Sequence, residues 1–213
     1  MVGDNSGEAA TDSQDHAATS QSDGSMLTRV IDELDRLDRD IYAAIADSPT
    51  STIDAPLRRL SNSANNSKIW IAAAAVISVL GGRPGRRAAL SGLVSIGVTS
   101  AVVNQGVKRL ADRPRPDRDG EDVPEARFVH MPESTSFPSG HSASGFAFAT
   151  TVGNSLPVVG AALRFLAGTV AYSRVHTGVH YPGDVVIGSL IGGSIGGLVS
   201  WVTRPRKKNE LAP

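Results

Sequence analysis

The sequence contains no cysteine, few aromatic residues and no net charge. Because none of the 213 residues is cysteine, disulfides, thiolate metal sites and cysteine nucleophiles are excluded. Aromatic residues make up only 5% of the chain, and the basic residues lie beside apolar runs, so no nucleic-acid-binding pattern is present. The zero net charge hides an asymmetry. Residues 1–67 carry twelve acidic residues against five arginines, and the rest of the chain is basic and apolar.

The N-terminal part lacks long apolar runs. Residues 1–25 are rich in Ser, Asp, Ala and Thr, a composition that predicts a disordered acidic tail. They contain no basic region followed by an apolar core, so we expect no secretory signal there. Residues 26–66 form an amphipathic helical segment in this interpretation, with Leu27, Ile31 and Leu34 at helical spacing. This segment carries too many charges to span a bilayer.

Residues 67–204 contain the long apolar stretches. Charge-free runs cover residues 69–82, 88–107, 142–163 and 185–203, and a fifth, 165–173, follows Arg164. A helix needs about 20 residues to cross a bilayer, with roughly 17–25 tolerated. We therefore predict an all-α, integral-membrane bundle of about five spans, with a turn near residues 154–157 and a basic C-terminal tail over 205–213. A soluble helical bundle is the alternative, but the glycine-rich last run favours close packing in lipid.

Three polar clusters each lie at an end of an apolar helix. They are Lys108 with Arg115-Pro116, Pro138-Ser139-Gly140-His141, and Ser173-Arg174 with His180 and Asp184. Tracing the chain through the bilayer, one helix arrives before the first cluster and another leaves after the second. The chain then returns through a hairpin to the third cluster. All three clusters are therefore predicted to meet at one membrane face.

The residue types in these clusters suit phosphate chemistry. Lys108, Arg115 and Arg174 are cations beside helix N-termini, where free N–H groups and the helix dipole favour a phosphate. Ser139 and Gly140 could complete the cradle with a hydroxyl and an unhindered N–H group. Two histidines, His141 and His180, provide a nucleophile and an acid. If the last helix begins early enough, Asp184 shares a helix face with His180, where it would fix the imidazole tautomer.

Together the three clusters resemble the signature of the type-2 phosphatidic acid phosphatase and haloperoxidase superfamily. The motifs Lys-x6-Arg-Pro, Pro-Ser-Gly-His and Ser-Arg-x5-His-x3-Asp match without a gap between residues 108 and 184. The resemblance implies a helical membrane bundle, no cofactor or metal, and a phosphohistidine intermediate. It also implies the roles. His180 attacks phosphorus, Asp184 orients the imidazole of His180, and His141 protonates the leaving group. Lys108, Arg115, Arg174, Ser139 and Gly140 hold the phosphoryl oxygens.

Other polar residues near the clusters receive less specific interpretations. We expect a structural role for His176, because the signature leaves its position free. We expect Arg109, Arg113 and Arg118 to be solvated or to face lipid head groups. Arginines at 83, 86, 87, 204 and 206 and lysines at 207 and 208 lie at the opposite helix ends, and positive charge marks the cytoplasmic side. The site is therefore predicted to face away from the cytoplasm, in a cell membrane.

The expected substrate is a lipid phosphate or pyrophosphate. Candidates are phosphatidic acid, phosphatidylglycerol phosphate, polyprenyl pyrophosphate and a polyprenyl-linked phosphosugar. The chain resembles short actinobacterial members of the superfamily, for which a cell-envelope role is plausible. Two other functions stay open: a vanadate haloperoxidase, with vanadate held at His180, and a non-enzymatic membrane scaffold. The oligomeric state does not follow from the sequence.

Overall fold

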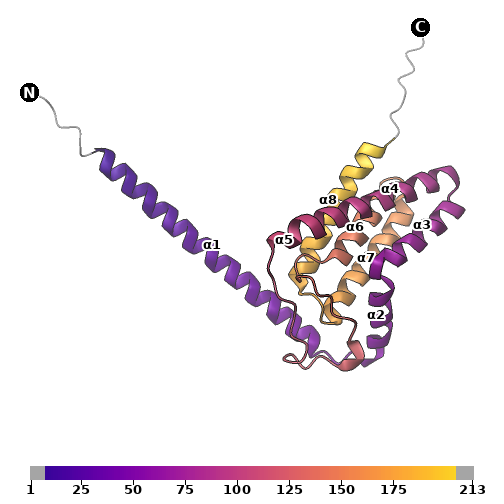
Figure 1. Ribbon diagram of the computed structural model, residues 1–213, viewed down its shortest axis with the longest axis horizontal. Helices are drawn as coiled ribbons and strands as arrows, with labels where there is room; N and C mark the ends of the chain where they lie inside the picture. The colour runs from indigo at the N-terminus through magenta and orange to yellow at the C-terminus, as the bar shows by residue number, and fades with distance from the viewer. Residues whose placement is uncertain (1–7, 205–213) are drawn as a thin grey trace, which may run out of the picture. The chain divides into compact units, whose positions relative to one another are not determined.

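The computed structural model describes residues 8–204, with side chains from residue 26 onward. The described part of the chain is helical and contains no strand (Figure 1). Its main helices are α1 (Glu8–Ala46), α2 (Ser51–Ser63), α3 (Lys68–Leu80), α4 (Gly82–Ala101), α6 (Gly140–Gly153), α7 (Pro157–His176) and α8 (Pro182–Thr203). Short elements complete it: η1 (Asn65–Ser67), η2 (Val102–Val107), α5 (Lys108–Leu110) and η3 (Glu125–Arg127).

The chain divides into two compact units, the first ending at Ile41 and the second beginning at Tyr42. The first unit is most of α1, and from residue 26 it includes the predicted amphipathic helix. On the polar face of this helix, Arg39 and Asp35 lie one helical turn apart and form an ion pair of 2.8 Å. Helix α1 begins at Glu8 and so runs through residues for which the composition predicts disorder. No proline interrupts them, and alanines favour helix there. Residues 1–7 of that tail lie outside the described residues.

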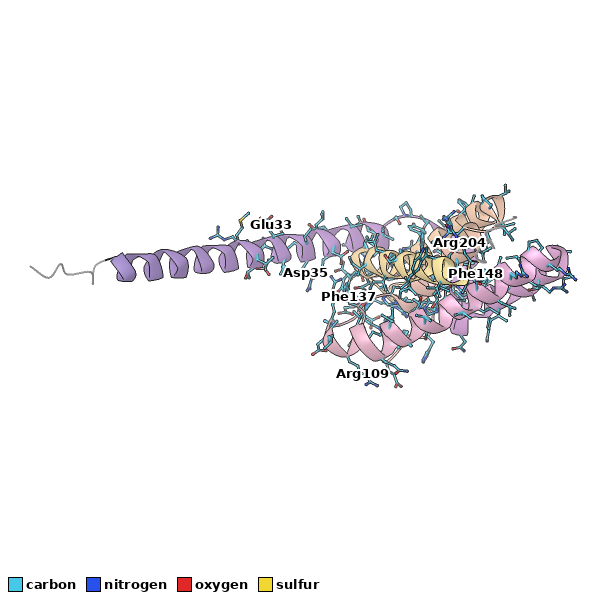
Figure 2. The ribbon with its side chains drawn as sticks, turned by 90° about the horizontal axis from the view of Figure 1, so that it is seen from above. Glu33, Asp35, Arg109, Phe137, Phe148 and Arg204 are labelled. Carbon is cyan, nitrogen blue, oxygen red and sulfur yellow. The ribbon has the colours of Figure 1, made fainter. Side chains whose placement is uncertain are left out.

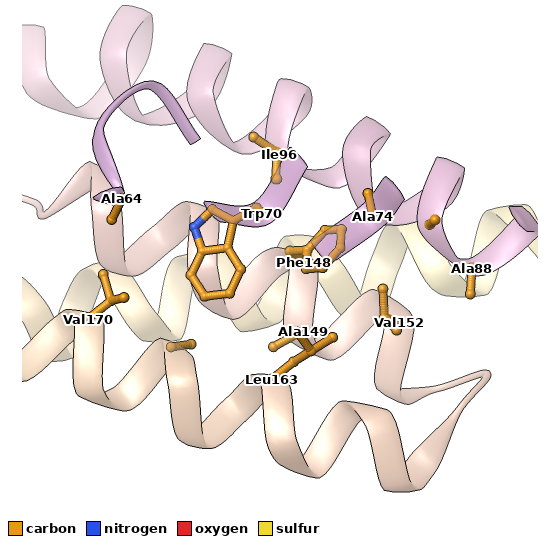
Figure 3. Close-up of a cluster of buried hydrophobic side chains, with 12 residues drawn as sticks. Ala64, Trp70, Ala74, Ala88, Ile96, Phe148, Ala149, Val152, Leu163 and Val170 are labelled. Atoms are coloured by element: carbon orange, nitrogen blue, oxygen red, sulfur yellow. The ribbon is translucent and has the colours of Figure 1, made fainter. Parts of the chain in front are cut away.

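The second unit is a helical bundle organised around α6. Helix α6 packs against α4, α7 and α8, while α3 pairs with α4 and α2 lies against α7. Figure 3 shows the core between these helices, where Trp70 of α3 and Phe148 of α6 lie with ring centroids 5.9 Å apart. Figure 2 shows Arg109 at the edge of the bundle; Arg109 and Arg204 are exposed, whereas Phe148 is buried. The predicted all-α bundle is therefore confirmed.

Glycines allow α8 to approach α6 closely. A Cβ at Gly188, Gly192 or Gly196 would lie 2.5, 2.0 or 2.5 Å from the backbone oxygen of a residue in or just before α6. The three glycines are four residues apart and so share one face of α8. Because a helix backbone cannot move aside as a side chain can, only glycine fits at these positions. This is the small-residue packing that membrane helices use.

Three helical segments are long and apolar enough to cross a membrane: Gly82–Leu110, Pro157–His176 and Pro182–Thr203. The first joins α4, η2 and α5 into one segment of 29 residues. Helices α3 and α6 occupy the positions of the other two predicted spans but have only 13 and 14 residues. The turn predicted near residues 154–157 is present, since α6 ends at Gly153 and α7 begins at Pro157. The bundle has five apolar helices, and the number that cross a membrane stays a prediction.

The two ends of the bundle differ in their polar residues. Arg83 and Arg87 at the start of α4 and Arg204 at the end of α8 line one pocket, together with Ser155 from the turn between α6 and α7. The three signature clusters lie at the other ends of these helices. The convergence predicted from the order of the apolar runs is therefore present. The predicted basic C-terminal tail, residues 205–213 with Arg206, Lys207 and Lys208, lies outside the described residues.

Candidate active site

A tight turn between α7 and α8 positions His180. Helix α7 ends at His176, and Gly178 follows with φ of 66°, a left-handed conformation that favours glycine at the end of a helix. The backbone N–H groups of Val179 and His180 both donate to the carbonyl oxygen of Arg174, at 3.1 and 3.3 Å. The turn therefore folds back on the last turn of α7, and the His180 side chain is buried.

The carboxylate of Asp184 reaches His180 from the first turn of α8. Because α8 begins at Pro182, His180 precedes the helix, so the early helix start that would place both residues on one helix face is not present. Instead Asp184 caps the helix: its Oδ2 accepts a hydrogen bond of 2.9 Å from the backbone N–H of Tyr181. The same oxygen lies 3.5 Å from Nδ1 of His180. A proton on Nδ1 then faces the carboxylate and leaves Nε2 with a free electron pair.

Two residues outside the expected site also bind Asp184. Arg113 forms an ion pair with Oδ1 at 2.9 Å, and its guanidinium lies 4.4 Å from the centre of the Tyr181 ring. The hydroxyl of Ser136 donates to Oδ2 of Asp184 and lies 3.5 Å from Nδ1 of His180. The interpretation of Arg113 as a solvated charge was wrong. The loop after Pro114 turns back, so that residues near 113 and 136 meet: the Ser136 N–H donates to the Arg113 carbonyl at 2.9 Å.

His180 faces a cavity of about 260 Å³ that all three signature clusters help to line. Lys108 and Arg115 of the first cluster, Gly140 and His141 of the second, and His180 of the third border it. The structure therefore brings together five of the eight predicted site residues around one space. Asp184 supports His180 from behind, as described above.

Arg115 is held mainly by backbone carbonyl groups. Its Nη1 donates to the Val179 carbonyl at 2.6 Å, while Nε and Nη2 donate to the carbonyls of Ser134 and Thr135 at 2.8 and 3.2 Å. Lys108 donates to the Ser134 hydroxyl at 3.0 Å. Burial lowers the pKa of Arg115 below its usual value, yet arginine stays charged at neutral pH. Arg115 thus brings positive charge to the cavity and also fastens the turn that carries His180.

Two predicted phosphate ligands do not line the cavity. Arg174 is buried, and its Nη1 donates to the Ser61 hydroxyl of α2 at 2.6 Å. Ser139 caps α6: its hydroxyl accepts a hydrogen bond of 3.0 Å from the Ser142 hydroxyl, and its backbone N–H donates to the Asp184 carbonyl at 2.9 Å. The charge of Arg174 helps to lower the pKa of His180, and Ser139 joins the second and third clusters through the backbone.

Burial and neighbouring cations lower the pKa of His180 to about 4. Burial is the main cause, because it disfavours the charged imidazolium. The bond to Asp184 opposes the shift, whereas the positive charges of Arg174 and Arg115 add to it. His180 is therefore neutral at pH 7, the form in which an imidazole nitrogen can act as a nucleophile.

His141 has a partner that the sequence did not predict. Its Nε2 lies 2.9 Å from Oδ1 of Asn65, which belongs to η1 just before α3. The amide oxygen accepts a hydrogen bond, so the proton lies on Nε2 and Nδ1 is left for proton transfer. Residues of η1 thus contribute directly to the site, and the boundary predicted between residues 66 and 67 falls within η1.

A second buried polar cluster lies close to the site in sequence. Oδ1 of Asp54 accepts hydrogen bonds from Arg127 at 3.0 Å and from His176 at 2.9 Å. Arg127 also donates to the carbonyls of Ala46 and Ser48, at 2.9 and 2.6 Å. This cluster ties the start of α2 to the end of α7. The structural role expected for His176 agrees with these contacts.

Arg118 lies in the same loop as Arg113 and is also buried. It donates to the carbonyls of Gly178 and Val129, at 3.2 and 2.9 Å. Its interpretation as a solvated or lipid-facing charge was wrong, whereas Arg109 is exposed as expected. The sequence signal that could have indicated buried roles for Arg113 and Arg118 is the high density of arginines in a loop that also contains acidic residues.

Comparison with known proteins agrees with this architecture. Residues 88–208 match the PAP2 superfamily. Decaprenylphosphoryl-5-phosphoribose phosphatase of Mycobacterium tuberculosis is 38% identical over 106 residues, which are 48% of this chain and 54% of that protein. The protein of the same name in Mycolicibacterium smegmatis is 34% identical over 151 residues, 70% of this chain and 77% of that one. The match thus spans about half the length of the M. tuberculosis relative.

Two solved structures share the fold. The crystal structure of LpxE from Aquifex aeolicus superposes with a TM-score of 0.58 at 20% identity, covering 78% of this chain and 95% of that one. The structure of a transmembrane PAP2-type phosphatidylglycerolphosphate phosphatase from Bacillus subtilis gives a TM-score of 0.64 at 23% identity, covering 83% and 89%. At these identities the likeness establishes the fold.

Proposed function

The chain belongs to the PAP2 superfamily, and we propose that it is a lipid phosphate phosphatase whose nucleophile is His180. The observation that carries this proposal is the cavity in which His180 and His141 face Lys108 and Arg115. A neutral imidazole, a second imidazole and two cations around one space are what transfer of a phosphoryl group to nitrogen requires. Such a reaction depends mainly on positioning and on stabilising negative charge.

The first step transfers the phosphoryl group to the protein. Nε2 of His180 attacks phosphorus, and the bond between phosphorus and the leaving oxygen breaks. His141, which the bound phosphate anion favours in its doubly protonated form, gives that oxygen its Nδ1 proton, so the dephosphorylated lipid departs as an alcohol. The carboxylate of Asp184, held by Arg113 and Ser136, accepts the Nδ1–H of His180 and stabilises the imidazolium that forms.

The second step hydrolyses the phosphohistidine. Water gives a proton to His141 and attacks phosphorus, and the electron pair of the N–P bond returns to Nε2 of His180. Inorganic phosphate leaves, and His141 is protonated for the next cycle. Lys108, Arg115 and the backbone N–H of Gly140 stabilise the phosphoryl oxygens in both steps. Arg174 contributes its charge without contact, and Ser139 holds the helix start in place.

We propose a polyprenyl-linked phosphosugar as the substrate. The support comes from the relatives in two mycobacteria, whose names specify a decaprenylphosphoryl phosphoribose. Phosphatidic acid, phosphatidylglycerol phosphate and polyprenyl pyrophosphate are the competing lipid classes. Three helical segments long enough to cross a membrane would bring the cavity within reach of such a lipid.

We also propose that the site faces away from the cytoplasm in a cell membrane. The support is the basic pocket at the other end of the bundle, where Arg83, Arg87 and Arg204 gather. Positive residues near the ends of membrane helices mark the cytoplasmic side. Labelling of single cysteines introduced at Arg86 and at Asp119 in intact cells tests this orientation, because the parent chain has no cysteine of its own.

The activity is tested by phosphate release from purified protein in detergent with EDTA. Wild type and His180→Ala are compared on the four lipid classes, with Arg109→Ala as an exposed control. We expect release by wild type and by the control, loss of release in His180→Ala, and the highest kcat/KM on the phosphosugar lipid. Equal release by wild type and His180→Ala would refute the nucleophile. No release from any lipid would refute the phosphatase.

A further inference from the structure

The cavity has a polar wall that the proposed chemistry does not use. Besides the phosphate-binding residues, it is lined by Asn66 and Ser67 of η1, and by Ser100 and Asn104 from the segment that leads to Lys108. A lipid phosphate without further polar groups would place only its acyl or glycerol carbons there. The two amides are exposed and the two hydroxyls half-buried in the open cavity, and covering them with such carbons would be unfavourable, because their hydrogen bonds to water would be lost.

Asn104 is oriented toward the phosphate end of the cavity. Its Nδ2 donates to the Ser100 hydroxyl at 3.0 Å, which fixes the amide. Its Oδ1 lies 3.9 Å from the position that a Cβ on Gly140 would occupy. Asn104 belongs to η2, a π-helical segment within an otherwise α-helical span, and such segments occur frequently at functional sites.

The residues of η1 lie next to the proposed acid. Asn65 binds His141, and the next two residues have φ of 53° and 58°. The left-handed conformation is unfavourable for residues other than glycine, though less so for asparagine, and strained residues of this kind cluster at ligand-binding sites. Asn66 and Ser67 line the same cavity as His141, so groups attached to the leaving oxygen come within reach of them.

Thr99 adds a hydroxyl without a partner to the same wall. Its Oγ1 is buried and has no hydrogen-bond partner among the side chains and backbone that the structure describes. Other helical threonines donate to the carbonyl four residues earlier, as Thr151 and Thr169 do at 2.8 and 2.9 Å. An unpaired buried hydroxyl is destabilising, and a water or ligand hydroxyl in the adjoining cavity would relieve this.

We infer that Asn66, Ser67, Ser100 and Asn104 form a hydroxyl-binding subsite for the group that carries the scissile phosphate. This inference rests on the proposed function and extends it. The subsite selects phosphate esters of a polyhydroxylated head group, such as a sugar, over esters of diacylglycerol. A cavity of about 260 Å³ suits a phosphorylated head group, while the lipid chain stays outside. Thr99 supports the subsite from behind.

The first test measures selectivity. For each variant the ratio of kcat/KM on decaprenylphosphoryl-5-phosphoribose to kcat/KM on phosphatidic acid is determined in the same detergent. We expect Asn104→Leu to lower this ratio about tenfold, the effect of one lost hydrogen bond to a substrate hydroxyl. Gln105→Leu, an adjacent exposed change outside the cavity, is the matched control and leaves the ratio unchanged. An unaltered ratio in Asn104→Leu would overturn the inference.

The second test needs no turnover and so separates the subsite from the phosphatase activity. In a His180→Asn background, calorimetry compares the binding of ribose 5-phosphate with that of pentyl phosphate, which has the same number of carbons but no hydroxyls. We expect ribose 5-phosphate to bind at least about tenfold more tightly, and Asn104→Leu to remove this preference. Equal binding, or no binding of either compound, would overturn the subsite. If ribose 5-phosphate is preferred but wild type hydrolyses no lipid, only the proposed function fails.

Discussion

Replacement of Arg113 by alanine tests whether the orientation of Asp184 limits catalysis. The guanidinium lies 2.9 Å from Oδ1 of a carboxylate that is fully buried, while Arg113 itself is 22% exposed. In the variant, Asp184 keeps the Tyr181 N–H and the Ser136 hydroxyl as partners, so the helix cap survives. What is lost is the charged partner that holds the second oxygen in place.

The expected loss in kcat follows from the strength of this contact. A hydrogen bond to a charged group contributes about 1.5–3 kcal/mol. If that stabilisation is fully expressed when the imidazolium forms on His180, kcat falls by roughly 10- to 100-fold, since about 1.4 kcal/mol corresponds to a factor of ten. Arg113 does not line the cavity, so KM for the lipid is expected to stay within about twofold.

Steady-state phosphate release by wild type, Arg113→Ala and Arg109→Ala checks this prediction. Arg109 lies in the same chain segment but is exposed, so its variant controls for the loss of one positive charge near the site. Melting temperatures in detergent show whether the proteins remain folded. A folded Arg113→Ala protein with more than half of the wild-type kcat would refute the role of Arg113. A rise in KM that accounts for the whole loss would instead indicate contact with the substrate.

Three further predictions concern packing, pH and the buried cluster. Gly192→Val forces a side chain to within 2.0 Å of the α6 backbone and is expected to abolish monodisperse protein, whereas Gly197→Val, where a Cβ meets nothing within 4 Å, is tolerated. Because the pKa of His180 falls from 6.5 to about 4 on folding, stability drops as pH falls from 6.5 toward 4, by about 2 kcal/mol at pH 5. Thermal unfolding of His180→Asn should show a smaller decrease between pH 7 and 5 than wild type. Arg127→Ala leaves a buried carboxylate without its cation and is expected to destabilise the protein by roughly 3–5 kcal/mol, against less than about 0.5 for exposed Arg59→Ala, measured by chemical unfolding.

Each of these has a distinct contradictory outcome. A Gly192→Val protein that purifies and melts as wild type would mean that α8 can move away from α6. An equal decrease of stability with pH in His180→Asn would assign the titration to another group. A small effect of Arg127→Ala would show that water replaces the guanidinium in its pocket.

The sequence alone determined the helical layout and predicted the residues that line the cavity. Long charge-free runs fix where helices lie, because a helix in lipid must satisfy its backbone internally and present apolar side chains. Their order fixes which helix ends meet, and so the three clusters converge at one end of the bundle. His180, His141, Lys108, Arg115 and Gly140 could be located in this way.

Only the tertiary structure determined which residues support them. Arg113 and Asp184 are 71 positions apart, and the pairs Asn65–His141 and Ser61–Arg174 are separated by 76 and 113. The loop between α5 and α6 has no periodic pattern, so its path could not be predicted, and with it the burial of Arg113 and Arg118. Hydrogen-bond partners depend on backbone paths and side-chain rotamers to within a fraction of an ångström. Apolar patterning and short motifs specify the helices and the reactive clusters. The hydrogen bonds between distant loops are decided only once those helices have packed.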